Sequence, residues 1–87
     1  MKPIETKGDV KFFGGVGGKM FQQIGEGEVF KVKNGQMGYK GIKQVNNHSI
    51  EYNTNGTHGF CVCKGKFILE DNIWSLAEAE QIANELF

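Results

Sequence analysis

The chain has 87 residues, of which 39% are hydrophobic, and its formal net charge is zero. This length predicts one domain, residues 1–87, whose core is large enough to fold but too small to hold a cofactor-binding fold beside a substrate site. All ten cations are lysines, and all lie in residues 1–66, whereas five of the ten acids lie in residues 67–87. Because arginine is the side chain that binds phosphate and guanine in a bidentate manner, its absence disfavours sequence-specific nucleic-acid binding.

The composition also bears on the compartment. The N-terminal segment lacks an apolar run and no stretch of eighteen apolar residues occurs, so we expect neither a signal peptide nor a contact with membranes. Cys61 and Cys63 are too few and too close together for a disulfide scaffold, which fits a reducing environment. These features together predict a cytoplasmic protein.

A glycine-rich segment lies between residues 8 and 27. Two runs within it, Asp9–Phe13 and Lys19–Ile24, are candidate strands on either side of residues 14–18, where four of the five residues are glycine. Glycine loses more backbone entropy on folding than any other residue, so this density predicts either a mobile loop or a backbone built for close approach. Its consecutive N–H groups beside Lys19 also suit an anion-binding nest.

Five further candidate strands follow residue 28, each bounded by turn signals. They are Glu28–Lys33, Met37–Val45, His48–Tyr52, Thr57–Cys63 and Lys66–Glu70. The turn signals between them are Asn34-Gly35, Asn46-Asn47, Asn53–Gly56 and Lys64-Gly65. Short connections favour antiparallel pairing of neighbours, so the sequence predicts an antiparallel β-meander of five to seven short strands, curled or closed into a small barrel.

The C-terminal residues change to a helical period. Ser75 followed three residues later by Glu78 is a capping box, and Trp74 is placed to pack on Ala79 as a hydrophobic staple. Apolar residues recur on one helix face at Leu76, Ala79, Ile82, Ala83 and Leu86. A helix this short is marginal in water on its own, so we expect this face to pack on the sheet and the fold to be α+β.

The histidines and cysteines offer the ligand types of a zinc site, namely His48, His58, Cys61 and Cys63. We expect no metal, because strand alternation places His58 on the face opposite Cys61 and Cys63, and no C-x-x-C motif occurs. Cysteines between Phe60, Val62 and a turn are expected to be buried structural thiols rather than activated nucleophiles. We therefore expect no enzyme activity and no cofactor.

The glycine segment does not match the nucleotide-binding signatures. The spacing of Gly14, Gly18 and Lys19 is one residue shorter than that of the phosphate loop, and Met20 stands where a hydroxyl should hold magnesium. The dinucleotide pattern that begins at Gly15 and Gly17 also fails, because Met20 stands at its third glycine. A nest of backbone N–H groups remains the one phosphate-binding device that this segment offers.

The aromatic residues beside the glycines are the candidate binding residues. The full set is Phe12, Phe13, Gly14, Gly15, Gly17, Gly18, Lys19 and Phe21. We predict a small binding protein that acts by protein–protein contact through this set; inhibitors of host machinery encoded by phages and other mobile elements provide an analogy. The alternatives are a domain that binds or sequesters a small phosphorylated ligand through residues 14–19, and a binder of single-stranded nucleic acid that stacks bases on the rings.

Overall fold

The computed structural model describes residues 2–33 and 38–86, which form two four-stranded antiparallel sheets and a C-terminal helix. The N-terminal sheet has the order β1 (Glu5–Lys7), β2 (Val10–Gly14), β3 (Met20–Ile24), β4 (Val29–Lys31). The C-terminal sheet has the order β5 (Tyr39–Val45), β6 (His48–Asn53), β7 (Phe60–Lys64), β8 (Phe67–Ile73). A 3₁₀ turn, η1 (Val16–Gly18), joins β2 to β3, and α1 (Leu76–Glu85) follows β8.

The predicted α+β class with antiparallel neighbouring strands is confirmed, but the strands form two sheets rather than one curled sheet or small barrel. The described residues contain eight strands rather than five to seven, because the sequence reasoning missed β1. This three-residue edge strand is fully exposed and has no apolar alternation, so it carries no strand signal of its own. The predicted Asn34-Gly35 turn lies outside the described residues.

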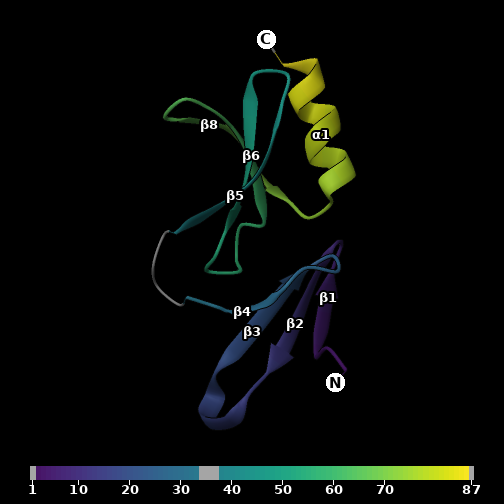
Figure 1. Cartoon of the computed structure of the whole chain (residues 1–87), viewed down its shortest axis with the longest axis vertical. Helices are drawn as coiled ribbons and strands as arrows, with labels where there is room; N and C mark the ends of the chain where they lie inside the picture. Colours follow the sequence, from purple (N-terminus) through teal and green to yellow (C-terminus); the bar gives the residue numbers. More distant parts are fainter. Residues whose placement is uncertain (1, 34–37, 87) are drawn as a thin grey trace.

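The two sheets lie end to end along the long axis of the molecule, which measures 44 Å, and α1 lies beside the C-terminal sheet (Figure 1). Both sheets contribute to one apolar cluster. The buried members are Val10, Phe12, Val32, Ile50, Tyr52, Phe60, Val62, Ile73, Ala79 and Ala83. The core is therefore shared between the sheets, although no strand of one sheet pairs with a strand of the other in the described part of the chain.

The helix agrees with its prediction from the sequence. Ala79 and Ala83 are fully buried, and the partly buried Leu76, Ile82 and Leu86 pack against the same cluster. The Glu78 N–H donates to Ser75 Oγ at 3.3 Å, as the capping box requires. A second cap was not foreseen: the Leu76 N–H donates to Asp9 Oδ2 at 2.7 Å, from a turn 67 residues away.

Polar contacts join the β1–β2 turn to the junction of β8 with α1. The Asp9 N–H donates to the Trp74 carbonyl at 2.9 Å, beside the contact of the Asp9 carboxylate with α1. The Trp74 ring packs edge to face on Phe12, with centroids 6.2 Å apart, and Lys7 Nζ lies 5.0 Å from the centroid of the Trp74 ring. This turn therefore fixes one corner of the N-terminal sheet against the start of the helix.

A buried hydrogen-bond network joins the sheets at a second place. Gln22 on β3 is fully buried, and its Nε2 donates to the Thr54 carbonyl at 2.9 Å. The Tyr52 hydroxyl donates to Gln22 Oε1. Burial raises the pKa of Tyr52, so the hydroxyl keeps the proton that this bond needs. The Lys33 N–H also donates to the Thr54 carbonyl, at 3.1 Å.

Replacing Ser75 with alanine is expected to lower the free energy of unfolding by about 0.5–2 kcal/mol, because the Glu78 N–H loses its side-chain acceptor. Urea denaturation followed by circular dichroism measures this loss. Ser75→Asn should retain most of the stability, since asparagine caps helices about as well as serine. Equal losses for the two variants would contradict a capping role.

Candidate functional site

Residues 14–18 of the glycine segment lie at the end of the N-terminal sheet that is away from α1, and they include the 3₁₀ turn η1 (Figure 1). The Gly15 N–H donates to the Lys19 carbonyl at 2.7 Å, which closes the loop over η1. Gly17 and Gly18 have φ of 74° and 77°, a left-handed conformation that side chains other than glycine rarely adopt. Val16, between them and Gly15, is 93% exposed.

Gly15 permits a close approach between the backbone and an aromatic ring. A Cβ at this position would lie 2.7 Å from Cε2 of Phe21, so a larger residue would displace the ring. The close-approach interpretation of the glycine segment therefore applies at Gly15, whereas Gly17 and Gly18 serve the turn itself.

The register of the sheet separates the adjacent residues Phe12 and Phe13 onto opposite faces. Phe12 pairs with Gln22 and is buried in the shared core at 4% exposure. Phe13 pairs with Phe21 on the opposite face, which we call the outer face, and neither ring belongs to the shared core cluster. Phe12 is therefore a core residue, and its predicted role as a contact residue is not supported by its position.

An apolar hollow of about 420 Å³ lies on this outer face, and we call it the N-terminal hollow. Its lining residues are Phe13, Gly14, Gly15, Phe21 and Val29. Phe13 is 8% exposed and Phe21 is partly buried, whereas Val29 is 53% exposed. The structure therefore brings four of the predicted site residues together and leaves Gly17, Gly18 and Lys19 outside the lining.

Val29 is the lining residue that the sequence reasoning missed. It belongs to β4, where it pairs with Gln23, two positions along β3 from Phe21. Residues two apart on a strand share a face, so the pairing of β3 with β4 places Val29 beside the rings. The alternation in Glu28–Lys33 was visible in the sequence, but its pairing register with β3 was not.

The charged residues on the outer face are cations. Strand alternation places Lys11 on the face of Phe13, and Lys31 pairs directly with Phe21. The other outward positions of the described β2–β4 strands hold Gln23 and Val29, which are uncharged. The N-terminal hollow is therefore an apolar depression bordered by positive charge.

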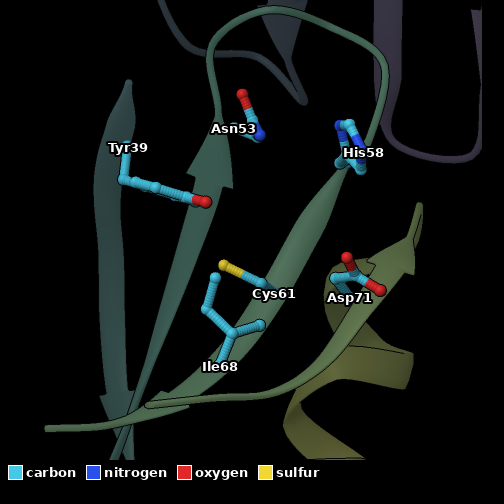
Figure 2. A pocket seen from close by; sticks show the side chains of 7 residues that line it. Tyr39, Asn53, His58, Cys61, Ile68 and Asp71 are labelled. Carbon is cyan, nitrogen blue, oxygen red and sulfur yellow. The ribbon is translucent and has the colours of Figure 1, made fainter. Parts of the chain in front are cut away.

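A second hollow, of about 100 Å³, lies on the face of the C-terminal sheet opposite α1 (Figure 2). Its lining residues are Tyr39, Asn53, His58, Gly59, Cys61, Ile68 and Asp71. We call it the Tyr39 hollow. The expectation that His58 and Cys61 face opposite sides of the sheet is wrong, since both residues line this hollow. β7 begins only at Phe60, and Gly59 has a φ of 68°, so the strand alternation does not extend back to His58.

The thiols in this region are not activated. Cys61 Sγ lies 3.5 Å from Cys63 Sγ, and both residues are buried. Burial raises the pKa of Cys61 and raises that of Cys63 to about 12, so both thiols are protonated at neutral pH. Figure 2 shows Cys61 Sγ pointing toward the Tyr39 side of the hollow and away from His58, whose Nδ1 lies 2.7 Å from Thr57 Oγ1.

The four residues considered for zinc are not gathered at one place. His48 lies at the start of β6, where its Nδ1 is 2.7 Å from the Asn46 carbonyl oxygen. Among the residues that the structure describes, no group of three or more His, Cys, Asp and Glu side chains is arranged to hold a metal ion.

Comparison with known protein families, with curated proteins and with solved structures finds no match for this chain. Within residues 2–33 and 38–86, no helix has the length and apolar character needed to cross a membrane. The geometry of the hollows and of the surfaces around them is therefore the basis for a functional proposal.

Proposed function

We propose that this protein is a non-enzymatic binding protein that acts by contact with a partner protein through the N-terminal hollow. The observation that carries this proposal is the apolar depression of about 420 Å³ between Phe13, Phe21 and Val29. Clustered aromatic residues in a pocket are the usual anchors of protein interfaces, because an inserted side chain removes much apolar surface from water. Action by occupying a partner's surface, as an inhibitor acts, needs no catalytic group.

The charge around the hollow indicates the chemistry of the partner. With Lys11 and Lys31 on the same face, the best complement is an apolar side chain flanked by acidic residues. The apolar insertion would supply most of the affinity, while the exposed charge pairs would mainly orient the encounter. We therefore expect binding to depend only modestly on salt.

Features of the glycine turn favour protein contact over the two alternatives. The Gly15 N–H donates to the Lys19 carbonyl, so this amide is engaged within the turn and is not free for a phosphate. Phe12 is buried and Phe13 is only 8% exposed, so among the three candidate rings only Phe21, which is partly buried, is within reach of a nucleic-acid base. Both alternatives give distinct outcomes in the experiment below.

The experiment begins by isolating the partner on immobilised protein and then measures its dissociation constant with purified components. Phe21→Ala is expected to weaken binding by about 2 kcal/mol, or roughly thirtyfold, because the hollow loses one of its two aromatic side chains. Val29→Asp should also weaken binding, since it places an acid where the partner brings acids. Val29 is 53% exposed, so this variant tests the surface without opening the core.

The control is Gln81→Ala, which shortens an exposed side chain on α1, outside both the N-terminal hollow and β8, and should leave this binding unchanged. Lys19→Ala should also have little effect. Full binding by folded Phe21→Ala and Val29→Asp proteins would refute the proposal. Loss of binding in Lys19→Ala with a phosphorylated compound as the captured molecule, or a steep salt dependence with captured nucleic acid, would favour one of the alternatives instead.

A further inference from the structure

We propose that β8 is a second interaction surface, which takes an extended, lysine- or arginine-bearing segment of a partner protein as a fifth strand of the C-terminal sheet. The inference concerns the opposite end of the molecule from the N-terminal hollow and does not depend on the function proposed for that hollow. It rests on the open edge of β8, on its exposed apolar residues, and on the carboxylates beside them.

β8 lies at the edge of its sheet. The strand order β5-β6-β7-β8 leaves its outer side unpaired with any strand of the described residues. It is one of the two longest strands, at seven residues, and six of them, residues 67–72, are exposed. The register of β7 with β8 shifts at two places and Asn72 has a φ of 58°, so the edge is irregular near its end. The exposed residues 67–70 still offer backbone donors and acceptors to which an incoming strand can bind.

The exposed residues of β8 are apolar at its start. Phe67, Ile68 and Leu69 are 73%, 49% and 42% exposed. Isolated apolar residues on a surface are ordinary, but three in succession on an open strand edge favour association. The same strand continues with Glu70 and Asp71, which are also exposed.

Two hollows lie against the same strand, and each includes a carboxylate. The Tyr39 hollow contains Asp71, which Figure 2 shows on β8 across from Tyr39. A second hollow of about 210 Å³ is lined by Tyr39, Glu51, Cys63, Gly65, Lys66 and Ile68. Ile68 and Tyr39 belong to both, so the two hollows lie side by side and can receive side chains from one bound segment.

The electrostatics favour a basic segment. Each hollow has one carboxylate in its lining, Asp71 in the Tyr39 hollow and Glu51 in the larger one, and Glu70 is exposed next to Asp71 on β8. Lys66 is the cation that lines the larger hollow, while the Tyr39 hollow has no lysine in its lining. A cationic side chain beside Ile68 would therefore meet Asp71 and the Tyr39 ring.

A second copy of this chain is a poorer occupant. Antiparallel pairing of two β8 strands centred on Glu70 would place Glu70 opposite Glu70 and bring both Asp71 carboxylates close to that pair. Like charges directly opposite each other on paired strands are destabilising. A basic segment replaces this repulsion with attraction.

The proposal is tested with a blocked eight-residue peptide of alternating lysine and valine, titrated into ¹⁵N-labelled protein. The amide signals of residues 67–72 are expected to shift, and Asp71→Asn should raise the dissociation constant about fivefold through loss of one charge pair. Glu26→Gln, which removes an exposed acid from the N-terminal sheet, is the matched control and should leave the constant unchanged.

Two further peptides separate strand addition from simple charge attraction. A version N-methylated at alternate residues keeps the charges but cannot complete the backbone pairing, so it should bind at least tenfold more weakly. A version with glutamate in place of lysine should not bind. Equal affinity of the methylated peptide, absence of shifts in residues 67–72, or a concentration-dependent dimer that Ile68→Ser abolishes would each overturn the proposal.

Discussion

Replacing Gly8 with alanine is expected to lower the free energy of unfolding by about 2–5 kcal/mol. Gly8 has a φ of 55°, and a Cβ there would lie 2.1 Å from the Trp74 carbonyl oxygen. The left-handed conformation costs a residue with a Cβ roughly 1–2 kcal/mol, and a forced shift of packed backbone costs roughly 1–3 kcal/mol more. Urea denaturation of the two proteins, followed by circular dichroism, measures the difference.

Gly25→Ala is the matched control for this prediction. Gly25 also has a φ of 55°, but a Cβ there would meet no heavy atom within 4 Å. Its substitution should therefore cost only the conformational part, about 1–2 kcal/mol. The difference between the variants isolates the contact of the β1–β2 turn with Trp74, and equal losses would show that this turn does not rest against the start of the helix.

Local patterns were sufficient to predict the helix and the tight turns. The cap at Ser75 depends on residues three apart, so it is encoded within one helical turn. Likewise Asn46 and Asn47 have φ of 51° and 63°, the left-handed conformation that a two-residue hairpin turn requires and that asparagine tolerates. These elements were predictable because their energetics are settled by neighbours in the sequence.

The long-range contacts could not be predicted from these patterns. Asp9 caps α1 from 67 residues away, and the two sheets are joined by contacts such as that of Gln22 with Thr54. Nothing near either residue in the sequence marks its distant partner. A polar residue such as Gln22 in a strand even suggests exposure, whereas the structure buries it completely.

The candidate site was predicted in part for the same reason. The sequence reasoning grouped glycine with aromatic residues, and four members of that group, Phe13, Gly14, Gly15 and Phe21, line one hollow. Adjacent residues on a strand face opposite sides, so only one of Phe12 and Phe13 could face outward. Phe12 faces the core because its face of the sheet packs against Trp74 and the apolar cluster. This packing is made by residues far away in the sequence, so the glycine segment alone could not show which of the two rings is buried.

Replacing Gln22 with leucine is expected to lower the free energy of unfolding by about 2–4 kcal/mol. The Tyr52 hydroxyl would lose its acceptor, Gln22 Oε1, inside the core, and a buried polar group without a partner costs roughly 1–3 kcal/mol. The Thr54 carbonyl would lose the Gln22 donor but keep the Lys33 N–H. Loss of this bond should therefore lower the free energy of unfolding by a smaller amount, roughly 0.5–1.5 kcal/mol. The loss is measured by urea denaturation at neutral pH.

A double-mutant cycle with Tyr52→Phe determines whether this network joins the sheets as a unit. Tyr52→Phe alone leaves Gln22 Oε1 without its hydroxyl donor, whereas the double variant removes both partners of that bond. The double variant should therefore be more stable than the sum of the single losses predicts, by about 1 kcal/mol or more. Additive losses would mean that Gln22 and Tyr52 contribute separately, and the joining of the sheets would then not depend on the bond between these two side chains.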